Sequence, residues 1–216
     1  MKNVAIILSG AGYLDGSEIY EATLTFLNLD RQHARYQCFA PDVPQHHVLN
    51  HLNGEAMAES RSVLVEAARL TRGDIKPLSA AHPDDFDALI IPGGYGAAKN
   101  LCDFASKGAA MSVNQEVLVF ARAIHRQGKP VGLICIAPVL APAIGGAGTR
   151  CTIGDDPATA AAIEHMGGVH VACAVDDCVT DAERRVVSTP AYMLAERIGE
   201  ADAGIRRLVE EVLRMA

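Results

Sequence analysis

The sequence predicts an α/β fold in which a mostly parallel sheet is covered by helices on both faces. Short apolar runs alternate along the whole chain with segments whose apolar residues recur every three or four positions. The apolar runs contain no alternating polar residues, which indicates strands buried on both sides. The 216 residues are 50% hydrophobic and 21% charged, and no linker or repeat divides them. We therefore expect a single domain over residues 1–216.

The first half of the chain is predicted to supply three strands and two helices. Its first strand is followed by Ser9-Gly10-Ala11-Gly12, and its second is stopped by Pro41, which cannot continue a hydrogen-bonded ladder. The expected elements are a strand at Val4–Leu8, a helix at Glu18–Leu29, a strand at Tyr36–Ala40, a loop at Val43–Gly54, a helix at Glu55–Leu70 and a strand at Asp87–Ile91.

The second half continues the alternation with three strands and three helices. Asp156 before Pro157 is a strong helix start, because Asp caps the first N–H groups and Pro fits the first turn. The expected elements are helices at Gln115–Arg126, from Asp155 to Gly167 and at Ala203–Met215, and strands at Pro130–Ile134, Val169–Ala174 and Arg185–Ser188.

Composition excludes several classes of function. A net charge of −7, no Trp and no long basic run argue against nucleic-acid binding. The uncharged stretch Val131–Thr149 is interrupted by Pro and Gly, so we expect no membrane span. The six cysteines form no C-x-x-C pair, which favours a reducing, cytoplasmic location. His46, His47 and His51 fit no standard metal site, and we expect no metal.

Cys135 is the sharpest chemical feature. It follows the predicted strand that ends at Ile134 and precedes Ile136-Ala137-Pro138 at the expected start of a helix. A nucleophile at such a turn faces backbone N–H groups and the positive end of a helix dipole, which lower a thiol pKa. The alternative is a buried structural cysteine.

The turn Pro92–Gly96 and two glutamates are expected near Cys135, because ligands bind at the carboxyl ends of parallel strands. The N–H groups of Tyr95 and Ile136 are candidates for an oxyanion hole, although a tight turn alone also explains the glycines. Glu18 and Glu21 open the first helix, where acids usually complement the dipole. In a dry pocket beside a thiol, either carboxyl can instead move protons.

The turn Pro92–Gly96, together with Gly132–Pro138, resembles the PfpI / class I glutamine-amidotransferase-like superfamily. Longer strings are similar to the ElbB family, also called enhancing-lycopene-biosynthesis or isoprenoid-biosynthesis proteins with an amidotransferase-like domain. These strings include Asp15-Gly16-Ser17-Glu18-Ile19, Cys38-Phe39-Ala40-Pro41-Asp42 and Thr189-Pro190-Ala191-Tyr192-Met193-Leu194.

The resemblance implies a flavodoxin-like three-layer sandwich, a homodimer and a nucleophilic Cys135. It implies a glyoxalase that uses no glutathione, metal or other cofactor and converts small 2-oxoaldehydes, glyoxal first and methylglyoxal less well, through a Cys135 hemithioacetal. Such an activity can be weak and can also be observed as deglycase activity. The resemblance places Gly94, Tyr95 and Ile136 at the substrate oxygen and leaves Glu21 and Glu18 as alternative proton shuttles.

The chain lacks the histidine that supports the cysteine in many members of the superfamily, and this argues against some of the superfamily's activities. Ile136 follows Cys135 where relatives carry a supporting His, and no His-x-Glu pair occurs in the chain. Amidotransferase and protease activities are therefore disfavoured. A flavodoxin-type FMN carrier is disfavoured because Ser9–Gly16 is not rich in Ser and Thr. The alternative from another class is a non-catalytic redox-sensing or binding protein linked to isoprenoid metabolism.

Overall fold

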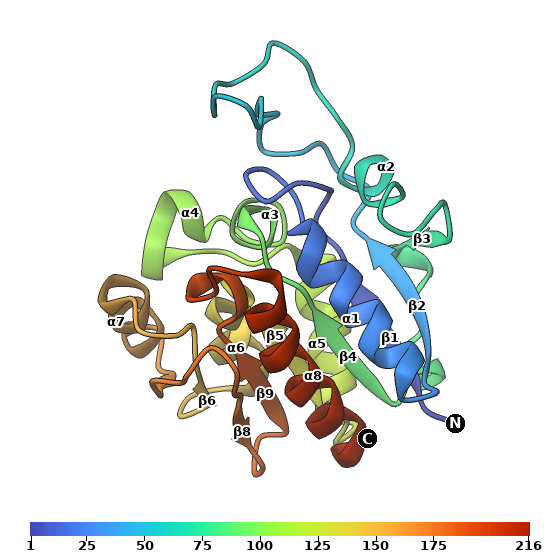
Figure 1. Cartoon of the computed structure of the whole chain (residues 1–216), viewed down its shortest axis with the longest axis vertical. Helices are drawn as coiled ribbons and strands as arrows, with labels where there is room; N and C mark the ends of the chain where they lie inside the picture. Colours follow the sequence, from blue (N-terminus) through green and yellow to red (C-terminus); the bar gives the residue numbers. More distant parts are fainter.

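The computed structural model describes residues 1–216 and has the α/β architecture expected from the sequence. Its main sheet has seven strands in the order β3-β2-β1-β4-β5-β9-β8. All neighbouring strands pair parallel except β8, which is antiparallel to β9. Helices α1 and α8 lie together on one face and α5 lies on the other, which makes a three-layer sandwich (Figure 1).

The element bounds are as follows. The strands are β1 (Asn3–Ile7), β2 (Arg35–Ala40), β3 (Ile75–Pro77), β4 (Ala88–Ile91), β5 (Val131–Ile134), β6 (Arg150–Cys151), β7 (Val169–His170), β8 (Val179–Asp181) and β9 (Val186–Thr189). The helices are α1 (Ile19–Arg31), α2 (Val63–Ala67), α3 (Tyr95–Lys99), α4 (Phe104–Lys107), α5 (Gln115–Arg126), α6 (Ala141–Gly145), α7 (Pro157–His165) and α8 (Ile198–Met215). Short 3₁₀ turns include Ala137–Leu140 and Ala191–Met193. None of these helices combines the length and the hydropathy that a membrane-spanning helix requires.

The core lies between the central strands and the helices on either side. Every residue of β4 and β5 is buried, as a strand covered on both faces requires. On α8, Ile205, Leu208 and Val212 recur at helical spacing and are fully buried against the sheet. This rigid centre fixes the carboxyl ends of β4 and β5 beside each other, since Ile91 pairs with Leu133.

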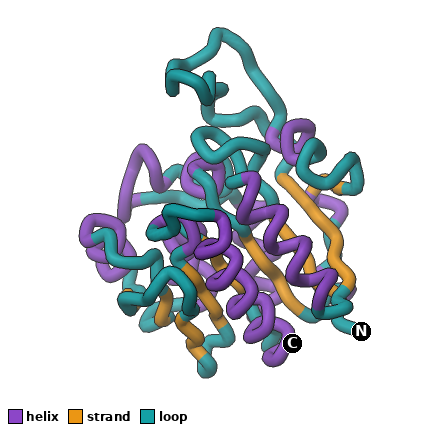
Figure 2. Tube along the Cα trace, viewed as in Figure 1, coloured by secondary structure: helices purple, strands orange, loops and turns teal.

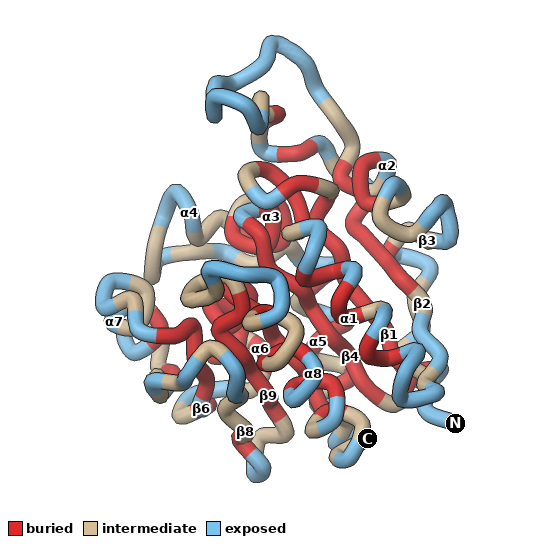
Figure 3. The backbone as a smooth tube through the Cα atoms, in the orientation of Figure 1, coloured by how far each residue is buried: buried red, intermediate tan, exposed pale blue.

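The predicted helix at Glu55–Leu70 is wrong in its first half. Residues 51–60 are all exposed, and only Val63–Ala67 is helical. Residues 43–62, which we call the arm, fold back on themselves and project from the body of the molecule (Figures 1 and 2). Antiparallel bridges join Pro44 to Ser62 and Leu49 to Ala56. These long-range pairs use the backbone groups that a helix would need. The arm is pale blue over most of its length in Figure 3, in contrast to the buried sheet.

Smaller differences lie at short or late elements. The expected strand Val169–Ala174 is only the two-residue β7, which pairs with β6 outside the main sheet. Helix α8 begins at Ile198 rather than Ala203, because the Glu200 carboxylate in its first turn accepts from the N–H and the guanidinium of Arg197. Strands β3 and β8 were not expected, since each has only three residues and no apolar run.

Candidate active site

Cys135 lies at the carboxyl edge of the sheet, directly after β5. Its backbone has φ 62°, a left-handed conformation that L-residues rarely adopt. Its N–H donates to the carbonyl of Thr189 at the end of β9, at 2.9 Å. Such local strain is held only where the surrounding structure enforces it, and it is typical of a nucleophile elbow.

Glu21 reaches the same point from the first turn of α1. Its carboxyl is fully buried, and its Oε2 accepts from the N–H of Gly93 at 2.9 Å. Its Oε1 accepts from the N–H of Tyr192 at 3.2 Å. The Cys135 side chain lies beside this carboxyl group, because a Cβ on Gly93 would touch both the Cys135 Cβ and Glu21 Oε2. The acid is thus fixed by two backbone donors while it contacts the sulfur.

The pKa values of this pair are both raised. Burial, together with the charge of the Glu18 carboxylate, raises the pKa of Glu21 to about 8. Burial, together with a charge on Glu21, raises the pKa of the Cys135 thiol well above its ordinary value. Glu21 is therefore the first of the two to ionise, and its carboxylate is then placed to accept the thiol proton.

The expectation of a lowered thiol pKa at Cys135 is wrong. The N–H groups of Gly94 and Ile136 do lower the pKa of Cys135, but the loss of solvent outweighs them. The turn after Ile136 is a short 3₁₀ helix, which has poorer hydrogen-bond geometry than an α-helix. The site instead provides an adjacent base for a neutral thiol.

The proposed oxyanion donor at Tyr95 needs a correction. The Tyr95 N–H donates to the carbonyl of Tyr13 at 2.7 Å and is not free for a substrate. The N–H of Gly94 faces the sulfur instead, together with that of Ile136. Tyr95 keeps a place at the site through its side chain, which lines the cleft above Cys135.

Glycine is required at two positions of the turn after β4. A Cβ on Gly93 would collide with the Cβ of Cys135 and lie 2.7 Å from Glu21 Oε2. Gly94 has φ +87°, and a Cβ there would collide with the backbone of Gly16 and Glu18. These two glycines let α1 and the Cys135 turn approach closely enough for the acid to reach the thiol.

A cleft of about 640 Å³ opens above Cys135. Glu18 lines it, and the Glu18 Oε2 also caps α1 by accepting from the N–H of Glu21 at 2.7 Å. The structure therefore brings Cys135, Glu21, Glu18, Gly94, Tyr95 and Ile136 to one place, with Glu21 rather than Glu18 on the sulfur. The cleft is lined by Tyr13, Glu18, Gly94, Tyr95, Ala98, Phe104, Ala105, Cys135, Ile136, Asp156, Thr159, Tyr192 and Met193.

Tyr13, Asp156 and Tyr192 are cleft residues that the sequence interpretation missed. A usable signal existed for Tyr192, because it follows a predicted strand at the same sheet edge. Asp156 was recognised only as a helix cap. Tyr13 sits in an irregular loop, so no periodic pattern marks it.

The histidines lie outside the cleft. In the arm, His47 Nε2 is 3.0 Å from the Lys99 ammonium, and His51 Nε2 is 3.6 Å from the Asp15 carboxylate. No group of three or more His, Cys, Asp or Glu side chains is arranged to hold a metal ion. The arm histidines therefore tie the arm to the body of the protein.

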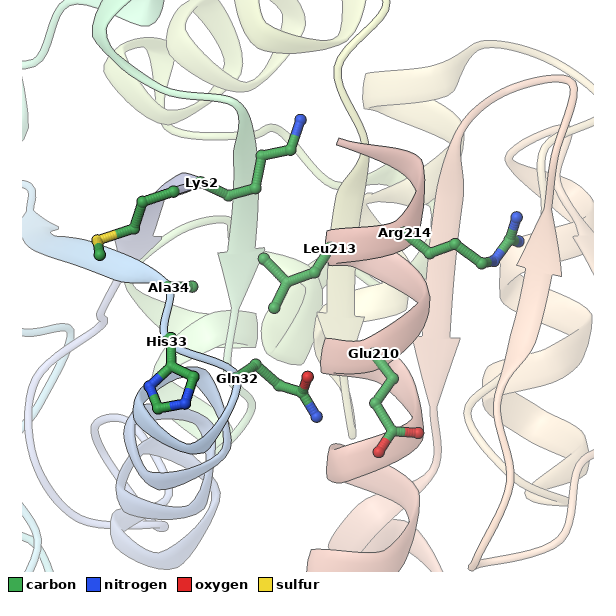
Figure 4. A pocket seen from close by; sticks show the side chains of 8 residues that line it. Lys2, Gln32, His33, Ala34, Glu210, Leu213 and Arg214 are labelled. Atoms are coloured by element: carbon green, nitrogen blue, oxygen red, sulfur yellow. The ribbon is translucent and has the colours of Figure 1, made fainter.

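A second hollow, of about 530 Å³, lies at the opposite edge of the sheet (Figure 4). Lys2 precedes β1 there, and Leu213 and Arg214 belong to the last turns of α8. It contains no cysteine and lies at the amino end of β1, whereas ligands of open parallel sheets bind beyond the carboxyl ends. We therefore take the cleft at Cys135 as the candidate functional site.

Fold and site together define a class: an α/β sandwich that holds a cysteine against a buried acid at the carboxyl edge of its sheet. The chain belongs to the DJ-1/PfpI family, whose model matches residues 13–191. A glutamine amidotransferase-like class 1 domain-containing protein 3, mitochondrial, from Homo sapiens is 42% identical over 98% of this chain and 82% of its own length. An ES1 protein, mitochondrial, from Danio rerio is 32% identical over 99% of this chain and 86% of its own length.

Comparison with solved structures supports the same family assignment. An isoprenoid biosynthesis protein with an amidotransferase-like domain from Ehrlichia chaffeensis is 36% identical, covers 100% of this chain and 99% of its own, and superposes with a TM-score of 0.93. This confirms the resemblance and the flavodoxin-like sandwich expected from the sequence. A glyoxalase III from Candida albicans covers 99% of this chain and 97% of its own with a TM-score of 0.62, but at 15% identity it shows the fold alone.

Proposed function

We propose that this protein is a cofactor-independent glyoxalase that converts glyoxal, and methylglyoxal less well, to the 2-hydroxy acid. The observation that supports it most is that the Cys135 side chain lies beside Glu21, a buried acid whose pKa is about 8. An acid with a pKa near the working pH can both take and return a proton. The reaction requires several such transfers at neighbouring atoms.

The first step is addition of the thiol to the aldehyde carbon. Ionised Glu21 takes the S–H proton as the C–S bond forms, and the aldehyde oxygen receives that proton to give a hemithioacetal. The N–H groups of Gly94 and Ile136, which face the sulfur, are suited to stabilise the negative charge on that oxygen.

The second step moves hydrogen between the two carbons. Glu21 removes the proton from the thiol-bearing carbon to form an enediol and returns a proton to the neighbouring carbon. The former aldehyde carbon is thereby oxidised to a thioester and the former ketone or second aldehyde carbon is reduced to an alcohol. Water then hydrolyses the thioester, which releases the 2-hydroxy acid and restores the Cys135 thiol.

The test is consumption of glyoxal with formation of glycolate by the purified protein without added metal or thiol. Cys135→Ser should abolish turnover. Cys173→Ser is the matched control, because Cys173 is more accessible than Cys135 but does not line the cleft. Equal glycolate formation by the wild type and Cys135→Ser would reject the proposal.

The redox-sensing alternative has less support. Oxidation of a cysteine follows its thiolate character and its exposure. Cys135 is only 7% exposed, and burial raises the pKa of its thiol.

The homodimer and the cytoplasmic location stay predictions. Light scattering of the purified protein tests the first, and fractionation of cells that produce it tests the second.

A further inference from the structure

The cleft above Cys135 is much larger than glyoxal requires. Its volume of about 640 Å³ lies in the range typical of pockets for drug-sized ligands, whereas glyoxal has only four heavy atoms. Nine of the thirteen lining residues are hydrophobic. The cleft can therefore accommodate a substrate with an apolar or aromatic body attached to the reacting carbonyl groups.

Tyrosine rings supply much of that lining. Tyr13, Tyr95 and Tyr192 line the cleft, and Tyr20 packs on Tyr192 with ring centroids 6.1 Å apart. The rings of Tyr13 and Tyr95 are about half exposed and so remain accessible to a ligand. The faces of such rings attract cations as well as other aromatic groups.

The charged groups of the cleft are all acidic. Glu18 and Asp156 line it, whereas no Lys, Arg or His does. Neither carboxylate forms an ion pair, although eight pairs of Lys or Arg with an acid form elsewhere in the molecule. Hydrogen bonds from Thr159 lower the pKa of Asp156, so this side chain is negatively charged at neutral pH.

One cation, Lys99, lies against a tyrosine of the cleft but forms its hydrogen bonds outside the cleft. The Lys99 ammonium lies 4.9 Å from the centroid of the Tyr95 ring, but it donates to the carbonyl of Leu14 at 2.7 Å and contacts His47 at 3.0 Å. Lys99 does not line the cleft. An anionic substrate would thus meet the ionised Asp156, and Glu18, whose pKa is raised by burial, without a Lys, Arg or His in the cleft lining.

We propose that the cleft selects 2-oxoaldehydes that carry a positive charge on an aromatic or apolar body. This inference rests on the proposed function and names the substrate class of the same site. The tyrosine faces that Lys99 does not cover would hold the body and its cationic group, and the Asp156 and Glu18 side chains would attract the charge. Anionic 2-oxoaldehydes would be rejected by the same carboxylates.

Helix capping also accounts for an acid at Asp156, since its Oδ1 accepts from the N–H of Thr159 at 2.8 Å. The two roles separate in Asp156→Asn, because Asn caps a helix about as well as Asp but carries no charge. Asp155→Asn is the matched control: Asp155 is the exposed neighbour and does not line the cleft.

The experiment compares three phenylglyoxals that differ only in the para group: trimethylammonium, hydrogen and carboxylate. For the wild type we expect kcat/KM to fall in that order, by on the order of tenfold from the cation to the anion. Asp156→Asn should lower the cation-to-anion ratio about threefold, while Asp155→Asn leaves it unchanged. A wild-type preference for the anion, or equal ratios in the two variants, would overturn the inference.

A binding measurement separates this inference from the proposed function. Cys135→Ser is titrated with phenyltrimethylammonium and with benzoate, and tyrosine emission is followed, since the chain has no Trp. The inference requires tighter binding of the cation in Cys135→Ser and a smaller difference when Asp156→Asn is added. If the wild type turns over none of the phenylglyoxals or glyoxal, the glyoxalase proposal fails, and this titration still decides the charge preference.

Discussion

Glu21 on the first helix lies beside Cys135, which directly follows the fifth strand, and both groups are almost fully removed from solvent. This contact joins a proton acceptor to a neutral thiol. It differs from the more familiar arrangement in which a nearby positive charge stabilises a thiolate. The consequence is that the chemistry of the site depends on the protonation state of the acid.

The pH profile of turnover should follow Glu21. Below a pH of about 8 its carboxyl is mostly protonated and cannot accept the thiol proton. We expect kcat/KM for glyoxal to rise about tenfold per pH unit well below pH 8 and to level off above it. Steady-state rates between pH 5.5 and 9.5 measure this. A profile that is flat across pH 8 would show that Glu21 is not the base.

Glu21→Gln should lower kcat by at least about 100-fold, because an amide cannot accept the proton. It should also leave one of the backbone N–H groups of Gly93 and Tyr192 opposite an NH₂ group, which costs about 1–3 kcal/mol of stability. Glu183→Gln is the control, since Glu183 is an exposed acid away from the cleft. Turnover by Glu21→Gln close to that of the wild type would contradict the assignment.

The same acid makes the stability depend on pH in an unusual direction. The pKa of Glu21 is raised from 4.5 to about 8, so between these values the folded protein binds a proton that the unfolded chain has lost. Its contribution to stability is fully present below pH 4.5 and is lost as the pH rises through about 8. Urea unfolding at pH 6 and pH 9 should show a larger decrease for the wild type than for Glu21→Gln. An equal decrease would mean that the acid is not protonated in the folded state.

Sequence reasoning predicted Cys135 and the glycine turn because each follows an apolar strand, and parallel strands end at one edge. It could not choose between Glu18 and Glu21, since both lie at the start of α1. The choice depends on how the helix is rotated against the sheet, and only Glu21 faces inward to the Gly93 N–H. The N–H of Tyr95 was misassigned because an irregular loop brings Tyr13 to it.

The arm shows a different limit of sequence reasoning. Glu55–Leu70 has helical spacing, and local propensity favours a helix. Backbone pairing between residues that are distant in the sequence overrides that propensity, as the bridge between Pro44 and Ser62 shows. Such pairs leave no periodic signal in a single sequence. The central strands were predictable because complete burial on both faces requires continuous apolar runs.

Gly93→Ala tests whether the close approach of Cys135 and Glu21 is needed. The added Cβ would collide with Cys135 and crowd the Glu21 carboxyl, so the acid and the thiol must separate. We expect turnover to fall at least about 100-fold and stability to fall by about 1–3 kcal/mol. Gly199→Ala is the control. Gly199 lies in α8, and no atom lies within 4 Å of the Cβ that the substitution adds, so the free energy of unfolding should rise by about 0.5–1 kcal/mol. Wild-type turnover in Gly93→Ala would show that the contact is dispensable.

Alanine is usually the more stable substitution for a buried residue and glycine the less stable one. The left-handed backbone at Cys135 predicts the opposite order for Cys135→Ala and Cys135→Gly. At φ 62° an alanine is strained by about 1 kcal/mol, whereas glycine is not. Cys135→Gly should therefore be more stable than Cys135→Ala, despite the greater entropy that glycine loses on folding. Cys102 is also buried but does not have a positive φ, so Cys102→Gly should be less stable than Cys102→Ala. Urea unfolding of the four variants measures both differences, and the same order at the two positions would mean that the elbow is not strained.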